Sequence, residues 1–95
     1  MKLIRKLGKQ YTATETGRTC SVQVEKRTYK TLFGTKVEYY FGYDILIGNN
    51  VLSTDNDRIV VGARDFQDAQ YRVFKMLGFN ENTKFSNEQE WDWNY

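Results

Sequence analysis

The alternation of apolar and polar residues is clearest in the middle of the chain, over residues 37–47. Apolar side chains occupy the odd positions of this segment, and the even positions are mixed. Successive side chains of a strand point to opposite faces, so the pattern predicts a strand with one apolar face. Residues 19–29 alternate in the same way, with Cys20 on the apolar side. The short glycine-containing connector between the two segments predicts that they pair antiparallel.

Weaker strand signals lie on both sides of this predicted pair. The threonine-rich segment 10–16 is a further predicted strand, paired to 19–29. A Gly-Asn-Asn turn signal precedes a short strand at 51–52, and an apolar run predicts another at 59–61. The polar composition of residues 53–57 predicts a loop between them.

The helix is the best specified element and is predicted over residues 65–77, where apolar side chains recur at helical spacing. Asp65 is a favourable N-cap residue, and Asp68 three positions later resembles a capping box. Gly78 stands where a left-handed residue ends many helices, and Phe79 is placed for the contact that accompanies such an ending.

These elements predict an α+β fold, an antiparallel β-sheet of three to five strands with one C-terminal amphipathic helix packed on one face in two layers. Residues 1–79 are expected to form the single domain. Residues 80–95 are acidic and aromatic and are expected to form a C-terminal tail. The tail either packs back on the sheet or binds a partner.

The residue types available for catalysis are few. The chain has no histidine, which excludes histidine-based nucleophilic triads and histidine-ligated zinc. Cys20, the single cysteine, is predicted to lie in the core. Asp55 and Asp57 lack the glycine and glutamate that would complete a calcium loop. We therefore expect a protein that is not an enzyme, without a metal or cofactor site.

Charge is distributed unevenly along the chain. Residues 1–36 carry nine Lys or Arg and two Glu, whereas residues 37–95 carry five Lys or Arg and ten Asp or Glu. The basic part could form a binding face. Alternatively, the two parts attract each other once folded.

No apolar run reaches membrane-spanning length, and the segment Met1–Gly8 is too short and interrupted for a signal peptide. One cysteine forms no internal disulfide, which is typical of a reducing compartment. We expect a cytoplasmic protein without membrane contact.

Two groups of residues are candidates for binding. The first carries the aromatic and acidic side chains expected to contact a protein partner. Its members are Tyr40, Glu90, Trp91, Asp92, Trp93 and Tyr95. The second, the basic group, suits phosphates and stacked bases and would make the chain a nucleic-acid-binding protein. Its members are Lys26, Arg27, Lys30 and Lys36.

Protein binding is the leading functional hypothesis, and direct nucleic-acid binding is the alternative. A compact, histidine-free chain without a family motif resembles the accessory proteins of bacteriophages and mobile elements. The specific form of the hypothesis is an inhibitor or modulator of a larger cytoplasmic complex that handles nucleic acid or acts in defence.

Overall fold

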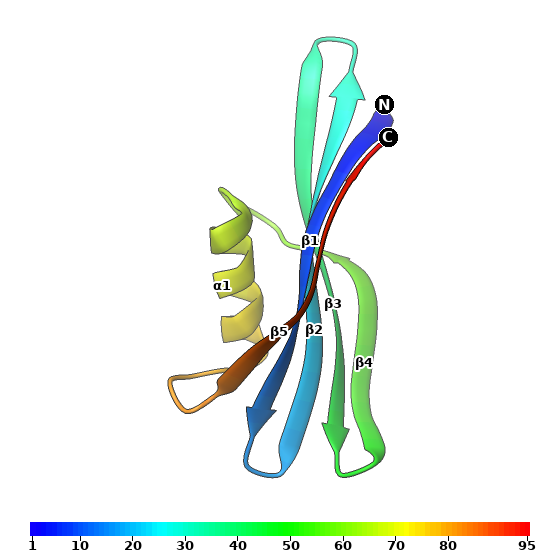
Figure 1. Cartoon of the computed structure of the whole chain (residues 1–95). Coiled ribbons are helices and arrows are strands. Elements are labelled where there is room, and N and C mark those ends of the chain that lie inside the picture. Colours follow the sequence, from blue (N-terminus) through cyan, green and yellow to red (C-terminus); the bar gives the residue numbers. More distant parts are fainter.

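The computed structural model describes all 95 residues and contains five strands and one helix (Figure 1). The elements are β1 (Lys2–Glu15), β2 (Arg18–Thr31), β3 (Gly34–Ile47), β4 (Asn50–Ile59), α1 (Phe66–Met76) and β5 (Lys84–Asn94). The strands form one antiparallel sheet in the order β4-β3-β2-β1-β5. The predicted α+β class and antiparallel sheet are confirmed.

The prediction of a C-terminal helix is wrong, because β5 follows α1 and pairs with β1. Figure 1 shows β5 running beside β1, with both chain termini at the same end of the sheet. Residues 84–94 are mostly polar. An edge strand is held by backbone pairing to its neighbour, which does not require an apolar pattern. Alternation is confined to the end of the segment, where Trp91, Trp93 and Tyr95 recur at every second position, and this was too short to predict the strand.

The predicted loop at residues 53–57 is also wrong, since these residues belong to β4. The register between β3 and β4 shifts between Phe41 and Tyr43, and Asp57 has a positive φ of 52°. Such irregularities are common at sheet edges, where an unpaired residue bends the strand. Residues 53–57 therefore form an irregular part of the edge strand β4 although they are polar.

One cluster of buried residues joins α1 to the central strands. From the sheet it contains Ala13, Cys20, Val22, Val24, Tyr39, Phe41 and Ile45, and from the helix Ala69, Val73 and Leu77. The predicted core position of Cys20 is confirmed, and burial raises the pKa of its thiol to about 11. A thiol with this pKa is a poor nucleophile at neutral pH.

Both ends of α1 follow the predicted capping pattern. The Asp65 side chain accepts a hydrogen bond from the backbone N–H of Asp68 at 2.8 Å. Gly78 has a φ of 80°, and the backbone N–H of Phe79 donates to the carbonyl of Phe74 at 2.9 Å. No helix in the structure is long and apolar enough to span a membrane.

Candidate functional site

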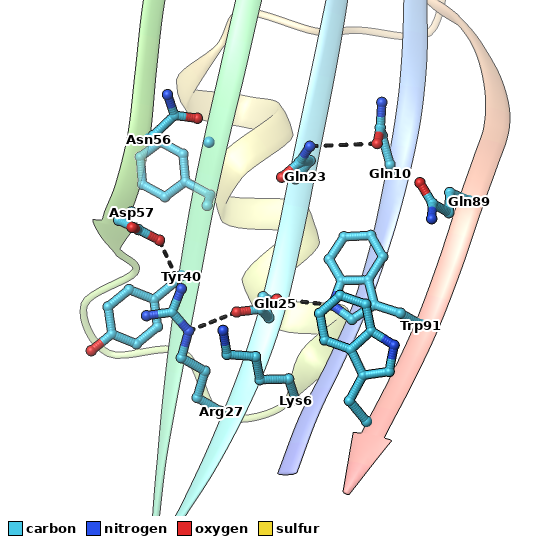
Figure 2. A pocket seen from close by; sticks show the side chains of 13 residues that line it. Lys6, Gln10, Gln23, Glu25, Arg27, Tyr40, Asn56, Asp57, Gln89 and Trp91 are labelled. Atoms are coloured by element: carbon cyan, nitrogen blue, oxygen red, sulfur yellow. Dashed lines mark hydrogen bonds and ion pairs between the residues drawn. The ribbon is translucent and has the colours of Figure 1, made fainter. Parts of the chain in front are cut away.

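The face of the sheet turned away from α1 carries the candidate site (Figure 2). Because side chains alternate along β2, Val22 and Val24 point toward the helix, whereas Gln23 and Glu25 point to the opposite face. All five strands contribute to a concavity of about 440 Å³ on this open face. Its lining includes Lys6, Gln10, Gln23, Glu25, Arg27, Tyr40, Asn56, Asp57, Gln89, Trp91 and Trp93.

Arg27 is fixed at one side of the concavity by three contacts. Its Nε donates to Glu25 Oε1 at 2.6 Å, and its Nη2 donates to Asp57 Oδ1 at 2.7 Å. The guanidinium carbon lies 4.0 Å from the centroid of the Tyr40 ring. Burial opposes the charged form of Arg27, but the hydrogen bonds and charges of the two carboxylates outweigh this effect and raise its pKa. Arg27 is therefore a permanently charged and immobilised part of the site.

Glu25 connects this arginine to the opposite side of the concavity. Its second oxygen, Oε2, accepts a hydrogen bond from the indole Nε1 of Trp91 at 2.8 Å. Its side chain is only 14% exposed. Both carboxylate oxygens are thus occupied, and Glu25 holds Trp91 and Arg27 in one network (Figure 2).

The Trp91 indole lies over Gly8, its cross-strand partner on β1. A Cβ atom at Gly8 would be 2.2 Å from the Cε2 and Cζ2 atoms of Trp91, so any other residue would displace the ring. Trp93 lies beside it, with ring centroids 6.2 Å apart and an angle of 35° between the planes. Trp93 is 54% exposed, so much of this aromatic pair faces solvent.

A bulge in β5 determines that the tryptophans lie on the open face. Gln10 of β1 pairs with Gln89, and the next residue, Tyr11, pairs with Asn87. Glu88 is therefore an extra residue of β5 with no partner on β1. Before the bulge, Phe85 stacks on Phe74 of α1 with ring centroids 4.8 Å apart, on the helix side. In strict alternation Phe85 and Trp91 would share a face. The extra residue reverses the alternation and sends Trp91 to the other side.

Three glutamines form a row across the floor of the concavity. Gln23, Gln10 and Gln89 are consecutive cross-strand partners on β2, β1 and β5. Gln23 Nε2 donates to Gln10 Oε1 at 3.4 Å, and Gln10 Nε2 donates to Ser21 Oγ at 3.2 Å. Each side-chain amide has two N–H donors and an acceptor oxygen, so the row retains hydrogen-bonding capacity toward the concavity.

The structure places only some of the predicted protein-binding residues in the concavity. Tyr40, Trp91 and Trp93 line the concavity together. Glu90 and Asp92 alternate with the tryptophans and form ion pairs with basic residues of β1 instead. Tyr95 follows β5, with a side chain 61% exposed.

The ion pairs of β5 join the acidic tail to the basic N-terminal strand. Arg5 Nη2 lies 2.7 Å from Asp92 Oδ2, and Lys9 Nζ lies 3.4 Å from Glu90 Oε1. The hydrogen bond from Arg5, together with its charge, lowers the pKa of Asp92. At this edge, the two oppositely charged parts of the sequence attract each other.

The residues of the basic group also lie on different surfaces of the protein. Arg27 belongs to the concavity, while Lys26 points to the other face because the two are consecutive on β2. Lys30 and Lys36 are exposed on the β2–β3 hairpin and form no ion pair. No group of three or more Cys, Asp or Glu side chains is arranged to hold a metal ion.

Several residues of the site were not identified from sequence, namely Gly8, Gln10, Gln23, Glu25, Asn56, Asp57 and Gln89. The alternation of residues 19–29 did place Gln23 and Glu25 on a polar face. It contained no information on which residues of β1 and β5 would lie beside them. Comparison with protein-family models, with curated proteins and with solved structures finds no match for the chain.

Proposed function

We propose that this protein is a non-catalytic binding module that engages a protein partner through the open face of its sheet. The observation that carries the proposal is the arrangement of Tyr40, Arg27, Trp91 and Trp93 around one concavity. Trp, Tyr and Arg are the residue types that contribute most to protein–protein affinity, chiefly where they surround a site from which water is excluded on binding.

The rigidity of the site supports binding. Arg27 and Trp91 are both held by Glu25 before any partner arrives. A pre-positioned side chain loses less conformational entropy on association than a mobile one, so more of its contact energy appears as affinity. The amide row supplies uncharged donors and acceptors, which suits the polar atoms of a protein surface.

The same hydrogen bonds argue against a catalytic role for Glu25. A general base must reach the substrate with one of its oxygens, whereas both oxygens of Glu25 already hold neighbouring side chains and its side chain is only 14% exposed. The more specific hypothesis, inhibition or modulation of a nucleic-acid-handling or defence complex, concerns the identity of the partner. This more specific hypothesis stays a prediction, and identifying the captured partner would test it.

The test is affinity capture from host lysate with quantitative mass spectrometry, using the full chain and two matched double variants. Tyr40→Ala with Trp93→Ala removes two aromatic side chains from the concavity. Tyr71→Ala with Met76→Ala removes two exposed side chains from the outer surface of α1. We expect the first variant to lose specific partners at least about tenfold, as loss of hot-spot residues does, and the second to retain them. Equal capture by both variants would contradict the proposal.

A further inference from the structure

The closed end of the β2–β3 hairpin exposes two large apolar side chains with no contact that explains them. Leu32 is 95% exposed and Phe33 is 100% exposed. Figure 1 shows this end of the hairpin projecting beyond both chain termini. Folding does not require apolar side chains at this position, and adjacent exposed apolar residues commonly mark an interaction site.

The backbone of the tip is held in place by its own turn. Thr31 pairs with Gly34 and leaves Leu32 and Phe33 as a two-residue connection. Thr31 Oγ1 donates to the carbonyl of Gly34 at 3.2 Å and accepts from the N–H of Phe33 at 3.4 Å. The two apolar side chains are therefore presented from an ordered turn.

The stem below this tip is predominantly basic. Residues 26–36 carry four Lys or Arg and no Asp or Glu, and the part of β3 that faces Lys26 and Arg27 adds one acid, Glu38. Arg27 is neutralised by its ion pairs in the concavity, but Lys26, Lys30 and Lys36 have no carboxylate partner. Lys2 of β1 is the cross-strand partner of Lys30 and adds to the same charge.

The unpaired lysines lie on both faces of the hairpin and at two levels along it. Lys26 and Lys30 share one face of β2, whereas Lys36 pairs with Tyr29 and points to the other face. Lys26 lies four residues below Lys30, which corresponds to about 13 Å along the strand. A partner that contacts all of them must present negative charge on two sides and along the length of the hairpin.

We infer that the β2–β3 hairpin is a DNA-binding arm that enters a groove of duplex DNA. Two-stranded β-ribbons bind in the major or the minor groove, and either groove is bounded by phosphates on both sides, which matches lysines on both faces. The apolar tip is suited to insertion between base steps, as Phe and Leu side chains do in minor-groove proteins that kink DNA. The tip and the unpaired lysines of the arm do not line the concavity, which the hairpin joins at Arg27, so this inference does not depend on the proposed protein partner.

A planar anionic membrane fits these charges less well. A membrane surface that received Leu32 and Phe33 would reach the lysines nearest the tip. Lys26 would remain about 13 Å further along the strand, beyond the screening length of about 8 Å at physiological ionic strength. The distribution of charge along the stem therefore favours a duplex over a lipid surface.

The first experiment measures binding of the full chain to a fluorescein-labelled 30-base-pair DNA duplex by anisotropy, between low and physiological salt. We expect affinity to fall steeply with salt. Lys30→Ala with Lys36→Ala should weaken binding at least about tenfold at the lowest salt and reduce the slope of log K against log salt by about 1.8. Lys75→Ala with Lys84→Ala makes the same charge change away from the arm and should alter neither value.

The second experiment tests the apolar tip. Leu32→Ser with Phe33→Ser keeps every lysine, so the salt slope should be unchanged, while a bend measured by energy transfer between the duplex ends should be lost. Both positions are almost fully exposed, so unchanged thermal melting should confirm that the variant folds.

Three results would overturn the inference. They are no duplex binding at low salt, equal weakening by the arm and control lysine variants, and an unchanged bend in the tip variant. Co-sedimentation with phosphatidylserine vesicles in the absence of duplex binding would instead assign the arm to a lipid surface.

Discussion

The two faces of strand β2 differ sharply although one backbone carries both. On one face Val22 and Val24 are fully buried in the cluster with α1. On the other, Gln23 and Glu25 belong to an open concavity held by hydrogen bonds and ion pairs. The covered face gains stability from burial, which requires apolar side chains but little specific geometry. The open face depends on particular donors and acceptors, so its residues are suited to recognition.

The largest expected effect comes from placing the same polar side chain on each face in turn. Val22→Asn buries an amide without partners and should lower the free energy of unfolding by about 3 kcal/mol or more. Gln23→Asn, one residue away on the exposed face, should change it by less than about 0.5 kcal/mol. Urea unfolding followed by circular dichroism measures both. Similar losses at the two positions would contradict the division between the faces.

A smaller loss is expected when the central carboxylate of the open face is removed. Glu25→Leu leaves the Nε of Arg27 and the Nε1 of Trp91 without their acceptor and should cost about 2 kcal/mol, since Arg27 retains Asp57. Glu90→Leu removes an exposed carboxylate from β5 and serves as the control, with a cost below about 0.5 kcal/mol. If Glu25→Leu costs no more than the control, the network does not stabilise the open face.

The position of Trp91 can be tested through the glycine beneath it. Gly8→Ala should displace the indole and cost about 1–2 kcal/mol, with a change in tryptophan fluorescence. In a Trp91→Ala background the same substitution has space and should cost much less. A double-mutant cycle from urea unfolding should therefore give a coupling of about 1 kcal/mol. Additive effects would show that the ring does not lie over Gly8.

The smallest expected effect is a pH dependence at the β1–β5 edge. The pKa of Asp92 in the folded protein is lowered from its ordinary value of 3.8 by the hydrogen bond and charge of Arg5. The folded state therefore binds the proton less readily than the unfolded state. The pair stabilises the protein above the ordinary pKa, and this contribution disappears as the pH falls through the lower folded pKa.

Urea unfolding of the native chain and of Arg5→Ala across this acidic range should show the predicted loss. The difference between the two proteins should be constant near neutral pH and shrink at pH values below 3.8. Lys2→Ala makes the same charge change at a residue without an ion pair and should show no such pH-dependent difference. A difference for Arg5→Ala that does not shrink in acid would assign its effect to packing.

Much of the fold could be predicted because its signals are local. The strands around residues 37–47 and 19–29 follow from alternation, and α1 follows from its apolar stripe and from Asp65 and Gly78 at its ends. The β5 strand was not predicted, because residues 86–90 are all polar and the alternation of Trp91, Trp93 and Tyr95 with polar residues covers only the end of the segment. Residues 53–57 of the irregular strand β4 were interpreted as a loop because they are polar as well.

The candidate site was predicted only in part. Tyr40 was identified from its place on the mixed face of the strand over residues 37–47, and Trp91 and Trp93 from their spacing of two residues in an aromatic tail. The structure places all three at the concavity. Glu25 and the glutamine row are ordinary polar residues in sequence. They become a site only through the lateral pairing of β2 with β1 and of β1 with β5.

The sequence by itself determined the α+β class, the core position of Cys20, the limits of α1 and the uneven distribution of charge. Each of these depends on neighbouring residues or on composition. Tertiary structure alone decided that β5 pairs beside β1, that Trp91 lies over Gly8, and that the bulge at Glu88 sends the tryptophans to the open face. These features depend on strand register, which is set by contacts between residues far apart in the chain. The pattern of neighbouring residues therefore cannot predict them.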